Sequence, residues 1–363
     1  MTGLVLGGLA ALALVSLATA AFLVARENRL LRLPFAPDEL HWARTTDGWM
    51  LPMGRYLPRG PRAAREPVIL CHGMGANRFN LDLNERHSVA RYLASRGFEC
   101  FVVELRGSGI TRRESKGRRY GFLFDDYVRS DLPALIAKAR EVAGAERVLW
   151  VGHSKGGIVM YAYCAMAPHP ELAGVVAIGS PAAFPHFTGV RRAFLSRGHA
   201  LLLLDGIYLE GLMRLLAPLG RHGLVRLQFM ASHENIEPQT TAYAMANLLG
   251  NISTGVTKQF ARWIGTGEFK SWDGKDDYRG GLVNSKVPFQ LIAGSIDVLV
   301  APSAVEAARD AMKAAEVEYF VAGVETGFKA DYGHGDLVLG RHAPEEIFPR
   351  VEAWLRDHGT RAE

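Results

Sequence analysis

Short runs of consecutive apolar residues recur along most of the chain, separated by more polar stretches. Six such runs lie at 67–71, 98–105, 147–151, 172–178, 287–293 and 317–322. Runs of this length and character predict strands that are buried on both faces. Strands of this kind occur mainly in parallel sheets that are covered by helices on both sides. The pattern therefore predicts a mostly parallel central sheet flanked by helices.

Helical patterns occupy the intervals between these predicted strands. In residues 126–143 the apolar positions form one stripe, and Gly144 is a typical stop signal. A second helix is predicted at Lys155–Met166, directly after a strand and shortly before Pro168. The alternation of strand and helix is typical of a doubly wound α/β domain.

Two regions depart from this alternation. Near the start, 39–45 and 49–57 read as strands on either side of Asp47-Gly48, a hairpin signal. Between 181 and 286 the alternation gives way to helical patterns and loops. We therefore expect a helical cap at 181–286, inserted into a core made of 38–180 and 287–363. The apolar segment 200–219 within this cap is either a lipid-facing lid or a face packed on the core.

The N-terminus carries a long uncharged stretch, residues 3–24. As a helix it would be long enough to cross a hydrocarbon core of roughly 30 Å. We expect residues 1–25 to form a retained membrane anchor with a transmembrane helix, followed by a linker at 26–37. The alternative is a signal peptide, cleaved near Ala18-Thr19-Ala20, which would make the protein secreted or periplasmic. The arginines at 26, 29 and 32 favour a single-pass protein with a cytoplasmic catalytic domain.

Composition narrows the class further. The chain has 363 residues, 48% of them hydrophobic and 22% charged, with a formal net charge of +5. Cations and anions are interspersed, so no nucleic-acid partner is expected. The basic run at 112–119 is either a contact for anionic lipid head groups or a solvated surface. Cys71, Cys100 and Cys164 cannot all pair and lie in apolar runs, which predicts buried free thiols. No motif suggests a metal or another cofactor.

The strongest chemical signal is the sequence Gly152-His153-Ser154-Lys155-Gly156, at the junction of a predicted strand and helix. A serine on such a sharp turn projects its hydroxyl above the sheet, and the two glycines let helix and strand approach closely. This context predicts Ser154 as a nucleophile.

A second glycine-rich loop, His72-Gly73-Met74-Gly75, follows the first apolar strand. Acyl transfer places negative charge on a carbonyl oxygen, which backbone N–H groups stabilise. We expect the N–H groups of Met74 and Lys155 to form this oxyanion hole. His72, Gly73, Gly75, Gly152 and Gly156 are predicted as supporting residues, with His72 bracing the loop.

The acid and the base are expected after the late strands, in the order serine, acid, histidine. Asp297 follows the strand at 287–293, and His334 lies between glycines after the last strand. These two residues are the predicted acid and base. His342 is the competing base, and Asp336 is interpreted as a supporting or structural residue.

Taken together, these motifs resemble the α/β-hydrolase superfamily over residues 38–358. They are HGMG (72–75), ELRGSG (104–109), GHSKG (152–156), GSIDVLVAP (294–302) and YGHGDLVLG (332–340). The likeness is strongest to acid-lipase-like and monoglyceride-lipase-like serine esterases, which implies an α/β-hydrolase fold and ester or lipid hydrolysis through an acyl-enzyme. Two departures are Lys155, where these lipases often have Met or Gln, and the lack of a set of cap cysteines.

The resulting hypothesis is a serine hydrolase that cleaves carboxylic esters, with lipophilic acyl esters as substrates. An acyltransferase with the same triad is one alternative, because an alcohol or a thiol can replace water. A membrane-tethered binding protein without activity is another. The expected partners are a small-molecule or lipid ester and a membrane. The sequence gives no oligomeric state.

Overall fold

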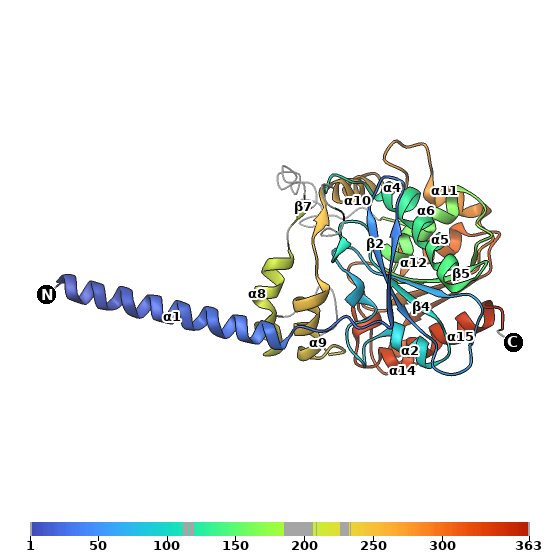
Figure 1. Cartoon of the computed structure of the whole chain (residues 1–363). Coiled ribbons are helices and arrows are strands. Elements are labelled where there is room, and N and C mark those ends of the chain that lie inside the picture. Colours follow the sequence, from blue (N-terminus) through green and yellow to red (C-terminus); the bar gives the residue numbers. More distant parts are fainter. Residues whose placement is uncertain are drawn as a thin grey trace.

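The predicted buried strands form one mixed sheet in the computed structural model (Figure 1), which describes residues 2–111, 115, 120–184, 206–207, 209–225, 232 and 234–361. Within this part of the chain the main sheet has eight strands. In spatial order they are β1 (Glu39–Arg44), β2 (Met50–Tyr56), β4 (Cys100–Val103), β3 (Val68–Cys71), β5 (Val148–His153), β6 (Leu172–Ile178), β9 (Phe289–Gly294) and β10 (Val317–Ala322). All pairs from β4 to β10 are parallel, as predicted.

The predicted hairpin is also confirmed. β1 and β2 pair antiparallel, and Gly48 in the turn between them has a φ of 88°, a region that favours glycine. β2 in turn pairs antiparallel with β4. The hairpin therefore extends the parallel sheet at one edge.

Strand register sets where the chemistry lies. Cys71 at the end of β3 pairs with Gly152 near the end of β5. Since parallel strands end at the same edge of a sheet, the 72–75 loop and the turn at Ser154 emerge side by side. Ile178 of β6 pairs with Ile292 of β9, which brings the loop with Asp297 to the same edge.

Helices cover the sheet in the intervals predicted. The larger ones in the core are α2 (Val89–Ser95), α5 (Leu132–Ala143), α6 (Lys155–Met166), α12 (Pro302–Ala311) and α15 (Phe348–His358). Shorter helical pieces are η1 (Arg78–Asn80), α4 (Phe124–Asp126), η2 (Tyr127–Asp131), α11 (Tyr278–Gly281), η5 (Leu282–Asn284), η6 (Val324–Thr326), α13 (Asp336–Leu339) and α14 (Ala343–Glu346).

The helix predicted at 126–143 differs in one respect from the expectation. It begins at Phe124, and its second turn, η2, is a π-helix rather than an α-helix. Its end is as predicted, because Gly144 takes the left-handed conformation with a φ of 65°.

Helices also dominate the region between β6 and β9. It contains α8 (Glu210–Arg221), α9 (Pro238–Tyr243), the π-helix η4 (Ala244–Leu248), α10 (Thr254–Thr266) and a small pair of strands, β7 (Gly206–Ile207) and β8 (Ile252–Ser253). The predicted cap boundaries at 181 and 286 stay a prediction. The segments 185–205 and 226–231 lie outside the described residues, as does most of the basic run at 112–119.

The N-terminal stretch forms α1 (Thr2–Leu30), which extends away from the rest of the chain and ends beside α8 and α9 (Figure 1). The helix continues past the uncharged stretch, and Glu27 near its end forms an ion pair with Arg221 of α8. Among the described residues, no helix is both long and apolar enough to cross a membrane. The prediction of a transmembrane helix is therefore not supported.

Candidate active site

Ser154 occupies a strained turn between β5 and α6. Its φ of 53° is the only positive φ of a non-glycine residue in the described chain. A Cβ added to Gly152 would lie 2.2 Å from the carbonyl carbon of Gly156, and one added to Gly156 would lie 2.3 Å from the Cys71 oxygen. Both contacts are far closer than van der Waals distance. The glycines are therefore what allows the strand and the helix to meet at this turn.

The end of β6 holds the turn in place. The backbone N–H of Ser154 donates to the Ile178 carbonyl at 2.7 Å, and the Ser180 hydroxyl donates to the Ser154 carbonyl at 2.8 Å. Strained backbone persists only where its surroundings fix it. These two bonds fix the serine from the neighbouring strand.

His72 braces the glycine-rich loop, as expected. Its Nε2 accepts from the Leu105 N–H at 3.2 Å, so Nδ1 carries the proton and donates to the Gly73 carbonyl at 2.8 Å. Burial, followed by the charge of Lys155, lowers the pKa of His72 well below its ordinary value. A neutral ring with both nitrogens occupied has no free nitrogen with which to act as a base.

Asn80 and His153 connect this loop to the rest of the site. Neither was predicted as a site residue, although His153 lies within the 152–156 motif. Asn80 is buried, and its Oδ1 accepts from the Gly73 N–H at 2.8 Å. His153 lies between Asn80 Oδ1 and the His334 carbonyl, at 3.0 Å from each. Burial, followed by the charge of His334, lowers the pKa of His153 to about 3, so the ring is neutral and donates to one of these oxygens at a time. For His153 the available signal was a polar residue shortly after the apolar run 147–151, whereas Asn80 lies among other polar residues and offered no such signal.

Asp297 and His334 are in direct contact. His334 Nδ1 lies 2.7 Å from Asp297 Oδ2, and both side chains are buried. The other carboxylate oxygen of Asp297 accepts from the N–H groups of Leu299 and Val300, at 2.9 and 2.8 Å. The backbone therefore aims the carboxylate at the imidazole.

Ser154 and His334 lie close together, but no direct hydrogen bond joins them among the described contacts. His153, the neighbour of Ser154, has its ring centroid 4.8 Å from that of His334. On the other side of Ser154, a Cβ added to Gly73 would lie 3.3 Å from the Ser154 Cβ. The structure thus brings the serine, the imidazole and the glycine-rich loop to one end of the sheet.

The competing candidates lie elsewhere or have other partners. His342 caps α14, and its Nδ1 is 3.8 Å from Glu345. Asp336 is fully buried and accepts from the Ser232 N–H and the Asn235 amide, each at 3.2 Å. Asp336 therefore links the loop of His334 to the 232–235 segment.

The glycine-rich loop at 72–75 also contacts the region between β6 and β9. The Gly250 N–H donates to the Gly75 carbonyl at 2.7 Å, and the Asn77 amide donates to the Asn247 carbonyl at 2.7 Å. No local sequence pattern predicts these contacts, because they join segments about 170 residues apart.

The cysteines are free and buried, as predicted. Burial raises the pKa of Cys71 to about 12, which makes a thiolate role unfavourable. In the described part of the chain, no group of His, Cys, Asp and Glu side chains is arranged to hold a metal ion.

Comparison with known families identifies the fold. Residues 66–328 match the family described as alpha/beta hydrolase fold. The chain belongs to the α/β-hydrolase fold family. The superfamily resemblance seen in the motifs is confirmed.

Individual relatives of this α/β hydrolase are lipases and esterases. Human lipase member N is 24% identical over 361 residues, covering 88% of each chain. The esterase EaEST from Exiguobacterium antarcticum superimposes with a TM-score of 0.58 at 16% identity, covering 87% of this chain and 98% of the esterase. The Paleococcus ferrophilus monoacylglycerol lipase gives a TM-score of 0.57 at 16% identity, covering 88% and 100%. The relatives bear out the predicted enzyme class, that of carboxylic ester hydrolases.

Proposed function

We propose that this α/β hydrolase cleaves carboxylic esters of lipophilic acyl groups through an acyl-enzyme formed on Ser154. The observation that carries the proposal is the strained Ser154 turn beside the buried pair of Asp297 and His334, with 2.7 Å between the paired atoms. A serine, an imidazole and a carboxylate in this order are the groups that nucleophilic acyl transfer requires.

The contacts of His334 assign its role in this mechanism. Nδ1–H donates to Asp297, which leaves Nε2 as the nitrogen that takes the Ser154 proton. The Ser154 oxygen then bonds to the ester carbonyl carbon, and the electron pair of the C=O bond moves to the oxygen. When that pair returns, the bond to the alcohol oxygen breaks and His334 gives its proton to the leaving alcohol. Water repeats the cycle and releases the acid.

The developing oxyanion needs hydrogen-bond donors. The Lys155 N–H is the first of α6 and has no intrahelical acceptor. The Met74 N–H lies on the loop that the Gly250 and Asn80 contacts hold against the serine. We propose these two N–H groups as the oxyanion hole. Removal of one such donor costs about 10²–10³ in kcat in serine hydrolases.

The preference for lipophilic acyl groups is supported by α8. Its leucines are exposed, with 49% of Leu212, 55% of Leu215 and 41% of Leu219 accessible to solvent. An apolar face of this kind on an element inserted between core strands suits a lipophilic substrate. The relatives named lipases point the same way. A series of p-nitrophenyl esters of increasing chain length tests this part, and an optimum at short chains would contradict it.

The nucleophile is tested by labelling with a fluorophosphonate probe. Wild-type protein should be labelled and should hydrolyse p-nitrophenyl esters, whereas Ser154→Ala should lose both. Ser95→Ala, which removes an exposed hydroxyl at the end of α2, is the matched control and should behave as wild type. Labelling that persists in Ser154→Ala would show that another residue is the nucleophile.

Acyl transfer uses the same residues and differs only in the acceptor. Product analysis in the presence of a primary alcohol separates the two reactions. Release of free acid alone supports hydrolysis, whereas a transesterified product as the main species would indicate the transferase. A wild-type protein with neither labelling nor turnover would favour a binding protein without activity.

A further inference from the structure

The side chain of Lys155 is almost entirely buried and lies next to the ring of Tyr127. Only 2% of the residue is exposed, and Nζ lies over the Tyr127 ring, 4.5 Å from its centroid. No described residue accepts a hydrogen bond from the ammonium group. Lysine is almost never fully buried unless it is paired, because an uncompensated charge is costly in the interior. An apolar side chain would suit the buried position 155 better. Lysine at this position therefore costs the folded protein free energy.

The groups around this ammonium do not neutralise it by contact. Those that interact with it are the Cys71 thiol of β3, the His72 ring on the following loop, and Tyr127 and Asp131 of the π-helix η2. Arg106, on the loop after β4, lines the same small pocket as Lys155. The thiol and the His72 ring are neutral, as shown above.

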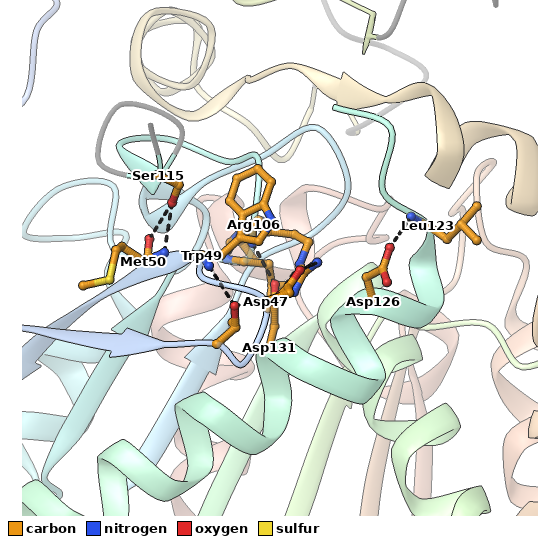
Figure 2. A network of polar contacts seen from close by, with 11 residues as sticks. Asp47, Trp49, Met50, Arg106, Ser115, Leu123, Asp126 and Asp131 are labelled. Carbon is orange, nitrogen blue, oxygen red and sulfur yellow. Dashed lines mark hydrogen bonds and ion pairs between the residues drawn. The ribbon is translucent and has the colours of Figure 1, made fainter. Parts of the chain in front are cut away.

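Asp131, the nearby carboxylate, is already engaged by another cation. Figure 2 shows Arg106 between Asp47 and Asp131. Arg106 donates through Nε to Asp131 at 2.7 Å and through both terminal nitrogens to Asp47, at 2.8 and 3.0 Å. The ring of Trp49 completes this network, with the guanidinium carbon 5.6 Å from its centroid. Arg106 is therefore paired with carboxylates, whereas the Lys155 ammonium has no hydrogen-bonded anion among the described residues.

This cation belongs to a residue that lines the same pocket as part of the proposed oxyanion hole. Its own backbone N–H is one of the two proposed donors, and its side chain lines the same pocket as Met74 and Gly75 of the other donor loop. The charge of Lys155 also contributes to the lowered pKa of His72, which lies within that loop. A unit charge within a protein acts more strongly on a developing oxyanion than it would in water, because the protein interior screens charges less.

We propose that the Lys155 ammonium stabilises the oxyanion through space, from behind the 72–75 loop and without touching the substrate. The inference rests on the proposed function. In this role the backbone N–H donates a hydrogen bond while the side chain of the same residue supplies a positive potential. The Tyr127 ring, 4.5 Å from Nζ, holds the ammonium in this position.

This role of the Lys155 ammonium makes the activity depend on pH. Burial lowers the pKa of Lys155 from 10.5 to about 8, so the ammonium loses its proton near pH 8. Activity should therefore fall above pH 8, as the positive potential disappears. A simple serine hydrolase without this charge keeps its alkaline plateau.

The test compares wild type with Lys155→Met, which keeps the backbone N–H and a side chain of similar length. We measure kcat and KM for a neutral p-nitrophenyl ester from pH 6 to pH 10, and the affinity for a trifluoromethyl ketone, which forms an oxyanion adduct. At pH 7 the variant should lose about tenfold in kcat and in ketone affinity, with KM within about twofold. Wild-type kcat should fall toward that of the variant above pH 8. Lys313→Met, at an exposed lysine, should match wild type.

The outcomes separate this inference from the proposed function. If the wild type is neither labelled by a fluorophosphonate nor active on esters, the proposed function fails. If the wild type is labelled and active but Lys155→Met keeps its kcat and its pH profile, the proposed role of the ammonium is wrong. A change confined to the preference between neutral and carboxylate-bearing esters would also overturn it, in favour of a substrate contact. If the variant fails to fold, the affinity of the wild type for the ketone is measured from pH 7 to pH 9.5. A constant affinity over this range would refute the proposed role of the ammonium.

Discussion

At the scale of single residues, the Asp297 carboxylate shows how a backbone can orient a side chain toward an imidazole. One oxygen accepts from two consecutive N–H groups, at Leu299 and Val300, and the other faces His334 Nδ1. This arrangement fixes which imidazole nitrogen carries the proton. In the proposed mechanism Asp297 therefore sets the tautomer of His334, in addition to supplying a negative charge beside it.

Asp297→Asn tests this assignment. The amide can present an N–H to His334 and favour the wrong tautomer, so we expect kcat to fall by about 10³–10⁴ with little change in KM. Steady-state hydrolysis of a p-nitrophenyl ester measures both constants. Asp310→Asn removes an exposed carboxylate on α12 and should have no effect. Activity within tenfold of wild type in Asp297→Asn would mean that another acid orients the base.

At the scale of elements, the junction of β5 and α6 is held by close backbone approach. A Cβ on Gly156 would lie 2.3 Å from the Cys71 carbonyl oxygen of β3. Neither strand can yield, because β3 and β5 are buried and hydrogen-bonded along their length. We expect Gly156→Ala to lower the free energy of unfolding by about 3 kcal/mol or more, as overpacking against backbone does. It should also reduce activity by displacing the Lys155 N–H.

Gly265→Ala in α10 is the control for that change. No atom lies within 4 Å of a Cβ added at Gly265, and α10 is helical there. Alanine in an open helical position is expected to raise the free energy of unfolding by up to about 1 kcal/mol. Urea unfolding of both variants measures the difference. If Gly156→Ala and Gly265→Ala were equally stable, the turn at Ser154 would be able to yield more than the close backbone contact suggests.

Elements that depend on local pattern were predictable, whereas those that depend on distant partners were not. The apolar runs located β3 to β6, and the glycine spacing located the Ser154 turn. The π-helix η2 escaped prediction, because its residues are placed by tertiary partners: Asp131 bonds to Arg106 and Tyr127 lies under Lys155. The N-terminal helix was predicted, but its uncharged sequence could not show that its end pairs with α8.

The same distinction holds for the site. Ser154, Asp297 and His334 each follow a predicted strand, so chain order alone was enough to select them. Neither Asn80 nor His153 was predicted as a site residue, because the contacts that connect them to the site span 73 and 181 residues of sequence. The sequence likewise could not show that the Lys155 side chain is buried in a pocket that Asn251 and Ile252 also line.

At the scale of the whole molecule, Asn247 connects three distant parts of the chain. Its side-chain Oδ1 accepts from the Leu33 N–H at 3.0 Å, and its Nδ2 donates to the Leu31 carbonyl at 2.8 Å. Its backbone carbonyl accepts from Asn77, next to the oxyanion loop, at 2.7 Å. The segment that follows α1, the π-helix η4 and the oxyanion loop therefore meet at one buried amide.

Asn247→Ala should release the segment after α1 while leaving the oxyanion loop bonded, since the backbone carbonyl remains. Two buried hydrogen bonds to that segment are lost, which should lower the free energy of unfolding by about 2 kcal/mol. Trypsin should also cleave faster after the exposed Arg32, because the backbone around it is no longer held. Asn284→Ala, at an exposed asparagine, is the control and should change neither property. Cleavage at the wild-type rate would mean that the ion pair between Glu27 and Arg221, rather than Asn247, holds this segment to the molecule.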